Sequence, residues 1–279
     1  MTAPPPPILG EPEQDATPLR LPHYWGPGGL FGDTLIKALL LAAGRGTRLG
    51  PLTANQPKPM IPIGGVPMIE RILTGIAAQT PIREFVLITG YKADVLQGYL
   101  GDGSRWGWHV QYVPQETPRG VGDAVNTARD VLVDTPFLMT YGDIMLDPAN
   151  YARFAAEYAQ TGLSEIKAYV GLNWVDDPWA GAAVYFDEGH VIERIQEKPP
   201  KGTATTHWNN AGLFVFDPLI FEYTAKIVPS ARGEYELPDA ITAMIQAGHK
   251  AKGIELQGSW RDVGTPEDYA AINAEYEMA

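Results

Sequence analysis

The chain has 279 residues, of which 45% are hydrophobic and 19% charged, and it contains no cysteine. These values are typical of a globular protein of one large domain or two modest ones, and they exclude disulfide scaffolds, thiol catalysis and cysteine-ligated metal sites. The 21 basic and 33 acidic residues give a formal net charge of -12, which disfavours nucleic acid and anionic membrane surfaces as partners. No stretch has the pattern of a membrane span or a signal peptide, so we expect a cytoplasmic protein.

The first 35 residues differ in composition from the rest of the chain. Residues 4–7 are consecutive prolines, and four more prolines follow before residue 28. Proline lacks an amide N–H and fixes its own backbone angle, so neither a regular helix nor a central strand is expected there. We predict a proline-rich tail and then an aromatic arm at 21–31, which either packs on the body or a neighbouring subunit or is loosely held.

From Ile36 onward, short apolar runs alternate with helical segments. The patterns predict strands at 37–42, 84–89, 109–113 and 136–141, with helices at 68–78, 93–100 and 120–131. Strands separated by helices indicate crossover connections and a mainly parallel sheet that is covered on both faces. The first half is therefore predicted to be α/β.

The second half has a more mixed pattern. Strands are predicted at 166–172, 182–186, 191–196 and 213–216, and helices at 238–246 and from Thr265 to the end. The turn residues at 187–190 indicate a hairpin between the second and third of these strands. Without an internal repeat or a linker, residues 36–279 are predicted to form one α/β domain, a Rossmann-like three-layer sandwich with a mixed, mainly parallel central sheet.

A glycine-rich loop follows the first predicted strand. It contains Gly44, Arg45, Gly46, Thr47 and Arg48. Glycines let a backbone approach a ligand closely, so that successive N–H groups can converge on phosphate oxygens. A dinucleotide fingerprint would need a third glycine where Leu49 stands, and the Walker A sequence is absent. With Lys58 close by, the loop indicates a site for a multiply charged anion.

The loop and several later motifs resemble those of the sugar-1-phosphate nucleotidyltransferases, also called nucleotide-sugar pyrophosphorylases. The resemblance is carried by residues 41–49, 51–53 and 57–60, and then by 141–143, 197–199, 210–212 and 260–265. It extends from about Ile36 to the last residue and leaves the first 35 residues unexplained. It implies a nucleotide-diphospho-sugar transferase-like fold, with a nucleotide half at about 36–147 and a sugar-binding half at about 148–279.

The implied reaction is attack of a sugar-1-phosphate oxygen on the α-phosphorus of a nucleoside triphosphate. The products are an NDP-sugar and pyrophosphate, so the protein must supply alignment, positive charge and a metal ion. The resemblance implies that Asp143 and Asp262 bind Mg²⁺. It implies catalytic roles for Arg48, Lys58, Asp143 and Lys198, with Arg48 and Lys58 holding the triphosphate and Lys198 holding the sugar phosphate.

The resemblance also implies which residues bind the two substrates. The nucleotide-binding residues would be Ala43, Gly44, Gly46, Thr47, Arg48, Gln115 and Gly120. The sugar-phosphate-binding residues would be Gly181, Glu197, Lys198 and Asn210, with Asn209 in place of Asn210 if the alignment shifts by one position. Carboxylate and amide groups suit the recognition of sugar hydroxyls.

The base and the sugar stay open at this level. A glutamine amide at Gln115 matches the imide edge of uracil or thymine, which favours UTP or dTTP slightly. Because an amide can flip, CTP is not excluded, and guanylyl enzymes share the same loop. The resemblance also leaves a homo-oligomer open, and no C-terminal hexapeptide-repeat domain is expected.

Two other functions compete with this interpretation. A glycosyltransferase also binds a nucleotide-sugar on a similar sheet, but it usually presents an Asp-x-Asp pair, whereas Ile144 and Met145 follow Asp143. A non-catalytic regulatory subunit that binds nucleotide-sugars could lose a metal ligand or a phosphate-binding cation. Here the expected metal ligands and phosphate-binding cations are all present, which favours an enzyme. They are Arg48, Lys58, Asp143, Lys198 and Asp262.

Overall fold

The computed structural model describes residues 37–161 and 165–277. The tail and the aromatic arm predicted at 1–35 therefore lie outside the described residues. None of the described helices is both long enough and apolar enough to cross a membrane.

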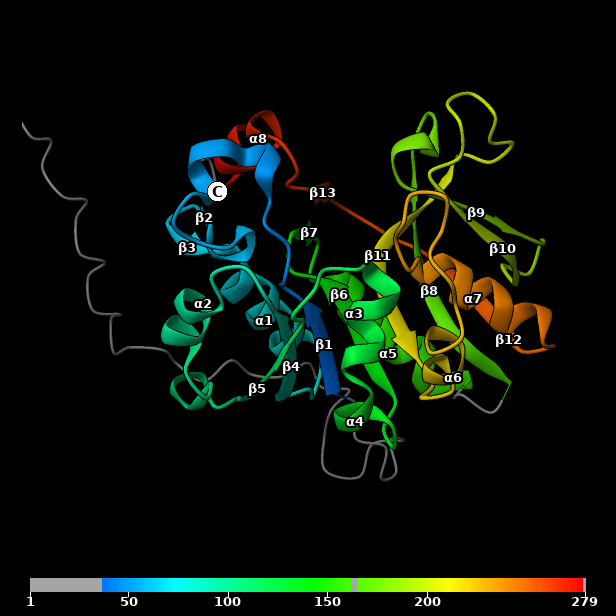
Figure 1. Ribbon diagram of the computed structural model, residues 1–279, viewed down its shortest axis with the longest axis horizontal. Coiled ribbons are helices and arrows are strands. Elements are labelled where there is room, and N and C mark those ends of the chain that lie inside the picture. The colour runs from blue at the N-terminus through cyan, green and yellow to red at the C-terminus, as the bar shows by residue number, and fades with distance from the viewer. Residues whose placement is uncertain (1–36, 162–164, 278–279) are drawn as a thin grey trace, which may run out of the picture.

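Four strands of the first half form a parallel run within a nine-stranded sheet (Figure 1). They are β1 (Lys37–Leu41), β4 (Glu84–Thr89), β5 (His109–Pro114) and β6 (Phe137–Tyr141). β1 lies between β4 and β6, and β5 pairs with β4. The interior residues of β1 are fully buried, as predicted for an apolar run that is covered on both faces. The parallel run places the carboxyl ends of all four strands along one edge of the sheet.

The second half extends this sheet with strands of both directions. They are β8 (Ile166–Trp174), β9 (Ala182–Phe186), β10 (Ile192–Glu197), β11 (Trp208–Phe216) and β12 (Lys250–Glu255). β11 pairs antiparallel with β6 and so joins the two halves into one sheet. β9 and β10 form the predicted antiparallel hairpin, and β12 pairs in parallel with β8. The predicted mixed α/β sheet is confirmed, although the sequence patterns did not indicate β12.

Helices cover both faces of the sheet, as the predicted three-layer sandwich requires. They are α1 (Met68–Gln79), α2 (Ala93–Leu100), α3 (Val121–Thr127), α4 (Arg129–Leu132), α5 (Ala149–Thr161), α6 (Ile220–Thr224), α7 (Leu237–Gln246) and α8 (Pro266–Glu277). One core cluster includes buried residues of α1, α2 and α5, and a second cluster includes those of α3, α4, α6 and α7. The sheet separates the two clusters.

The helix predicted over 120–131 is interrupted, and this corrects the prediction. α3 ends at Thr127, whose hydroxyl donates to the carbonyl oxygen of Asp123 at 2.8 Å. The N–H of Ala128 donates to the carbonyl of Val125, three residues back, which tightens the last turn. A threonine bonded to its own helix competes with the regular backbone ladder, so α4 begins as a separate turn.

A short two-stranded ribbon lies outside the main sheet. β7 (Ile144–Leu146) pairs antiparallel with β13 (Trp260–Asp262), and Ile144 lies opposite Asp262. Asp143 directly precedes β7, so the ribbon brings two acids that are 119 positions apart in sequence into one place. Neither strand was predicted, because three residues carry too little pattern for a strand to be recognised.

Short 3₁₀ segments and a small hairpin complete the fold. They are η1 (Thr47–Thr53), η2 (Lys58–Met60), η3 (Ser104–Trp106), η4 (Pro178–Ala180), β2 (Pro62–Ile63) and β3 (Val66–Pro67). Figure 1 shows α8 beside β2 and β3, which lie about 200 positions earlier in the sequence. There the side-chain oxygen of Asn273 accepts a hydrogen bond from the N–H of Gly64 at 2.8 Å. The last described segment of the chain therefore returns to the first half.

Candidate active site

The glycine-rich loop after β1 forms one wall of a cavity of about 250 Å³. Loop residues that line it include Gly44, Gly46, Thr47 and Arg48, and Lys58, Pro59 and Asp143 lie across from them. Gly46 has a left-handed backbone with φ of 63°, and a Cβ there would lie 2.9 Å from the Cβ of Lys58. Both the backbone conformation and the close approach of Lys58 therefore require glycine.

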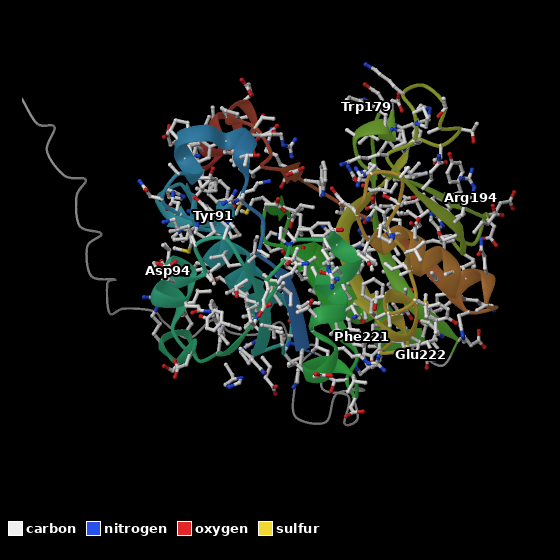
Figure 2. The ribbon with its side chains drawn as sticks, viewed as in Figure 1. Tyr91, Asp94, Trp179, Arg194, Phe221 and Glu222 are labelled. Atoms are coloured by element: carbon white, nitrogen blue, oxygen red, sulfur yellow. The ribbon has the colours of Figure 1, made fainter. Side chains whose placement is uncertain are left out.

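The other loop residues are directed differently. Ala43 does not line the cavity, and its carbonyl accepts a hydrogen bond from the N–H of Tyr91 at 3.3 Å. Arg45 holds its guanidinium 5.1 Å from the ring centre of Tyr91, which is labelled in Figure 2. Arg48 lies against Gly264, where a Cβ would be only 3.1 Å from its Nη2. Of the two loop arginines, Arg48 is thus the one beside the cavity.

Lys58 lies between two carboxylates from distant parts of the chain. Its side chain is 8% exposed, and its Nζ lies 2.5 Å from Oδ2 of Asp143 and 3.2 Å from Oδ1 of Asp262. The turn η2 positions Lys58, the end of β6 positions Asp143, and the ribbon of β7 and β13 positions Asp262. A buried ammonium is costly unless it is paired, and this one is paired twice.

The two carboxylates are not fully neutralised by Lys58. Burial raises the pKa of Asp262 above its ordinary value, and the like charge of Asp143 raises it further. Lys58 and Arg48 act in the opposite direction but do not cancel the increase. A pair of acids with a surplus of negative charge is an environment that a further cation would stabilise.

These two acids have the chemistry of a magnesium site. Mg²⁺ takes oxygen ligands, commonly one or two carboxylates, and completes its coordination with phosphate oxygens and water. The side chains of Asp143 and Asp262 are 33% and 46% exposed and both line a cavity, so they are open to a ligand. Within the described ranges no cluster of three or more metal-ligating side chains exists, so the remaining ligands would have to come from substrate and solvent.

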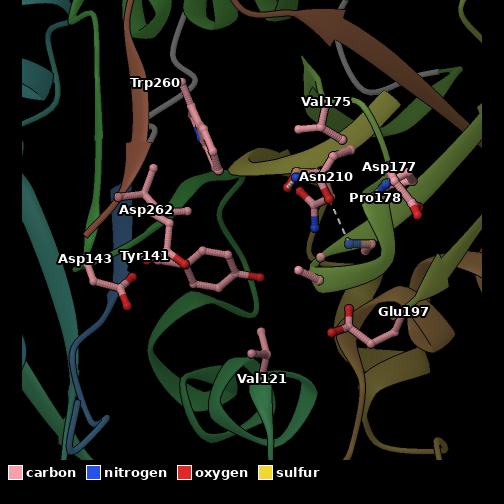
Figure 3. Close-up of a pocket in the computed structure, with 15 residues that line it drawn as sticks. Val121, Tyr141, Asp143, Val175, Asp177, Pro178, Glu197, Asn210, Trp260 and Asp262 are labelled. Atoms are coloured by element: carbon pink, nitrogen blue, oxygen red, sulfur yellow. Dashed lines mark hydrogen bonds between the residues drawn. The ribbon is translucent and has the colours of Figure 1, made fainter. Parts of the chain in front are cut away.

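A larger cavity of about 480 Å³ begins at the same two acids (Figure 3). Its lining includes five of the predicted site residues, which are Asp143, Asp262, Gly181, Glu197 and Asn210. Figure 3 shows Asp143 and Asp262 on one wall and Glu197 on the opposite wall. Lys198 is exposed and does not line the cavity, although its backbone N–H donates to the carbonyl of Gly181 at 2.7 Å.

The strand β11 presents two asparagines to this cavity, and their side chains differ in role. Asn209 is committed to the scaffold: its Oδ1 accepts from the N–H of Ala182 at 2.9 Å, and its Nδ2 donates to Asn173 and to the carbonyl of Asn210. A Cβ at Gly181 would lie 2.1 Å from Oδ1 of Asn209, so this contact needs glycine. The Oδ1 of Asn210 accepts a hydrogen bond from the N–H of Gly212, and Asn210 lines the cavity.

Glu197 belongs to a second charged cluster. Its carboxylate lies 3.6 Å from Nη2 of Arg232, which also pairs with Glu234 at 3.2 Å and Glu236 at 2.8 Å. Burial and the nearby charge of Glu236 raise the pKa of Glu197 to about 7, while Arg232 opposes the increase. Sequence analysis missed Arg232 and Glu236. In the sequence, Arg232 is followed by a glycine and then by Glu234 and Glu236. This pattern is common on solvated surfaces and does not by itself indicate a site.

The predicted base-binding residues line neither cavity but lie at the same sheet edge. The backbone N–H of Gln115, after β5, donates to the carbonyl of Thr89 at the end of β4. Its side-chain Nε2 donates to Oδ2 of Asp123 at 2.8 Å. Gly120 has φ of 119°, and a Cβ there would lie 2.6 Å from the carbonyl oxygen of Tyr235. Sequence analysis missed Asp123, because no spacing rule relates it to Gln115.

Two tryptophans, Trp174 and Trp179, are next in sequence to Val175 and Pro178, which line the larger cavity. Trp174 is 60% exposed and stacks on His207 at 4.6 Å, and Trp179 is 46% exposed. Figure 2 shows Trp179 at the outer tip of the second half. A different tryptophan, Trp260, does line the cavity, and its Nε1 donates to the carbonyl of Ala211 at 2.8 Å.

Comparison with known proteins places this geometry in context. A family profile described as nucleotidyl transferase matches residues 37–279. The chain is 33% identical over 242 residues to the bifunctional protein GlmU of Methanococcus maripaludis, covering 86% of this chain and 54% of that protein. It is 33% identical over 246 residues to a glucose-1-phosphate thymidylyltransferase of Streptomyces griseus, covering 85% and 65%. The chain thus spans about half the length of the bifunctional relatives.

Two solved structures share the fold. A Bacillus anthracis protein, assigned as a glucose-1-phosphate thymidylyltransferase and crystallised with sucrose, superposes with a TM-score of 0.77 and 28% identity over 88% of this chain and 96% of its own. A UDP-glucose pyrophosphorylase in complex with UDP-glucose also gives 0.77, at 22% identity over 88% and 99%. At that identity the second comparison supports the fold alone.

Proposed function

The chain belongs to the nucleotidyl transferase family, and on that premise we propose that it transfers a nucleotidyl group from a nucleoside triphosphate to a sugar 1-phosphate. One observation carries this proposal: Asp143 lines both cavities. A triphosphate held by the glycine loop and a sugar phosphate in the larger cavity would therefore meet at this carboxylate. Both substrates bring their own reacting groups, so the task of the protein is to align them and to neutralise their charge.

The smaller cavity has the features expected of a triphosphate site. Gly44, Gly46 and Thr47 offer backbone N–H groups close to the ligand, and Ala43 anchors the base of the loop. Arg48 can grip two phosphate oxygens with its planar guanidinium, whereas Lys58 acts as a compact charge. We assign these two cations to the phosphates of the nucleotide and to the negative charge that grows as pyrophosphate leaves.

Mg²⁺ is the cofactor that the proposed reaction needs, and Asp143 and Asp262 are the residues that would hold it. When bound, the ion neutralises phosphate charge and polarises the reacting phosphoryl group. Lys58, which pairs with both carboxylates, holds them close together.

The larger cavity is assigned to the sugar 1-phosphate. Glu197 and Asn210 would bind hydroxyls, because a carboxylate accepts and an amide both donates and accepts hydrogen bonds. Gly181 would let the ring approach the backbone. Lys198 is exposed and forms no ion pair among the described residues, so its ammonium is available to the phosphate of the incoming sugar.

The nucleotide is proposed to be UTP or dTTP, with CTP and GTP as the alternatives, read by Gln115 and by the backbone around Gly120. Support comes from the amide chemistry of Gln115 and from the thymidylyltransferase among the relatives. We also propose that the substrates are small molecules rather than nucleic acid, in keeping with the net charge of -12.

The reverse reaction tests the proposal. Incubated with Mg²⁺, pyrophosphate and a nucleotide-sugar, the protein is expected to release a nucleoside triphosphate, which chromatography can measure. Parallel reactions with UDP-, dTDP-, CDP- and GDP-sugars identify the base. If no triphosphate forms with any of them, the proposed activity is wrong.

A substitution pair tests the assignment of Asp143. Asp143→Asn removes a carboxylate that lines both cavities, and turnover is expected to fall at least about 100-fold while the protein still folds. Asp147→Asn is the matched control, because Asp147 only caps a turn, accepting from the N–H of Ala149 at 2.9 Å, and asparagine caps equally well. Equal activity of the two variants would refute the assignment.

A further inference from the structure

The carbonyl group of Gly46 is bonded within the glycine-rich loop. Its oxygen accepts a hydrogen bond from the N–H of Leu49 at 3.0 Å and another from the hydroxyl of Thr53 at 3.1 Å. A carbonyl oxygen has two lone pairs, so both are used by residues of the loop itself. None is left for a ligand in the smaller cavity, which Gly46 lines.

The opposite side of the same peptide unit carries the N–H of Thr47. In a trans peptide the C=O and the following N–H point in opposite directions, and the described residues contain no cis peptide bond. Fixing the carbonyl of Gly46 therefore fixes the direction of this N–H. Thr47 is the first residue of η1, so its N–H has no acceptor within that segment, and Thr47 lines the smaller cavity beside Gly46.

Thr53 acts on this peptide unit from behind the loop. It is buried and does not line the cavity, and a Cβ at Gly46 would lie 3.2 Å from its Cγ2. Its hydroxyl also lies 3.2 Å from the carbonyl oxygen of Gly50, so its one hydrogen is shared between the two glycines. Gly46 and Gly50 have positive φ angles of 63° and 53°. Glycine rotates most freely, so the hydroxyl of Thr53 holds the loop at its two most adaptable points.

Tyr91 in turn holds the backbone of Thr53. Its hydroxyl lies 2.9 Å from the carbonyl oxygen of Ala54 and 3.2 Å from that of Thr53. Its backbone N–H donates to the carbonyl of Ala43 at 3.3 Å, so this one residue contacts both ends of the loop (Figure 2). The position of Thr53 therefore does not depend on its own side chain alone.

We propose that Thr53 is a positioning residue that keeps the N–H of Thr47 directed at the phosphates of the nucleotide. This inference rests on the proposed function, because it needs a phosphate group in the smaller cavity. Without the hydroxyl, the peptide unit between Gly46 and Thr47 is free to turn and to present its carbonyl oxygen, which repels a phosphate. Binding would then have to order the loop as well, which weakens affinity.

The test measures the dissociation constant of inorganic pyrophosphate in the presence of Mg²⁺ by calorimetry. Thr53→Val keeps a similar shape and removes the hydroxyl, and the dissociation constant is expected to rise about tenfold. Thr53→Ser returns the hydroxyl and should restore the constant to within about twofold of the wild type. Tyr91→Phe, which removes the hydroxyl that holds the backbone of Thr53, should give a smaller rise of about threefold.

Thr80→Val is the matched control for a loss of stability alone. Thr80 is buried and lines neither cavity. Its hydroxyl donates to the carbonyl of Ile76 at 2.7 Å and accepts from the N–H of Ile82 at 3.2 Å. The control should therefore lower the melting temperature at least as much as Thr53→Val does, while the dissociation constant of pyrophosphate stays unchanged.

Each outcome bears on the inference. A Thr53→Val protein that binds pyrophosphate as tightly as the wild type would overturn it, and so would a Thr80→Val protein that loses as much affinity. Failure of Thr53→Ser to restore binding, or a wild type that does not bind pyrophosphate, would overturn it as well. If Thr53→Val does not fold, Tyr91→Phe decides, and an unchanged constant there refutes the inference.

The proposed function can fail separately. If pyrophosphate binds but the reverse reaction yields no triphosphate, the proposed activity is wrong. The comparison of the Thr53 variants would still decide the role of this residue, because binding does not require turnover.

Discussion

Two charged clusters face each other across the larger cavity, and both carry more acids than bases. On one wall a single ammonium, Lys58, serves Asp143 and Asp262. On the other wall a single guanidinium, Arg232, serves Glu197, Glu234 and Glu236. Both clusters therefore have an excess of negative charge, but different species can neutralise it.

Exposure explains the difference. The side chains of Asp143 and Asp262 are open to the cavity, so a hydrated divalent ion can reach them. Glu236 is 4% exposed and Glu197 is 22% exposed, so the second cluster is relieved most easily by a proton, and the pKa of Glu197 rises to about 7. Two unbalanced acids that are open to the cavity can thus attract a divalent ion, whereas in the more buried cluster the unbalanced charge raises the pKa of Glu197.

The largest expected effect comes from breaking the first cluster. Lys58→Met leaves Asp143 and Asp262 facing each other without their shared cation, and it removes a charge from the smaller cavity. Turnover is expected to fall by about 100- to 1,000-fold. Saturating Mg²⁺ should restore part of the lost thermal stability but not the activity. A variant that keeps more than a tenth of the wild-type kcat would show that Lys58 serves only the fold.

A smaller effect is expected from the second cluster. Arg232→Met removes the charge that opposes protonation of Glu197, so the pKa of Glu197 should move above 7. In the proposed sugar contact the ionised carboxylate of Glu197 is the acceptor, so the KM for sugar 1-phosphate should fall as pH rises through this pKa. In the variant that fall should occur at higher pH, with KM raised about three- to tenfold at pH 7. An unshifted KM profile would separate Glu197 from the sugar.

The smallest effect is on stability. A carboxyl whose pKa is raised in the folded state, here from 4.5 to about 7, stabilises the fold fully below pH 4.5 and loses that contribution as pH rises through 7. Wild type should therefore lose on the order of 1–3 kcal/mol between these limits through this one group. Glu197→Gln should flatten that part of the curve in denaturant unfolding measured at several pH values. Parallel curves would show that folding does not raise the pKa of Glu197.

The sequence carried enough information for the framework of the molecule and for many of its site positions. The apolar runs at β1, β4 and β6 each fill a strand that is mostly buried on both faces, and a glycine loop after such a strand has few alternative structures. The turn residues before β10 predicted its hairpin for the same reason: the signal is local.

Features that depend on contacts between segments distant in the sequence could not be predicted from the sequence. β7 and β13 contain three residues each, and they pair only because the fold brings them together. The contact of Asp123 with Gln115 spans eight positions across a loop and a helix start, a spacing with no periodic meaning. Arg232 could be recognised as part of the site only once Glu197 was placed beside it. Which loop residues actually line a cavity also had to come from the structure.

The ribbon of β7 and β13 sets the spacing of the two acids through backbone register. Ile144 lies opposite Asp262, and successive residues of a strand point to alternate faces. A slip of one residue in β13 would turn the carboxylate of Asp262 away from Asp143, while the hydrogen-bonded pairs of the nine-stranded sheet would be kept. A single inserted or deleted residue near Trp260 is therefore expected to abolish the proposed activity. The distance between the two acids depends on only three backbone pairs.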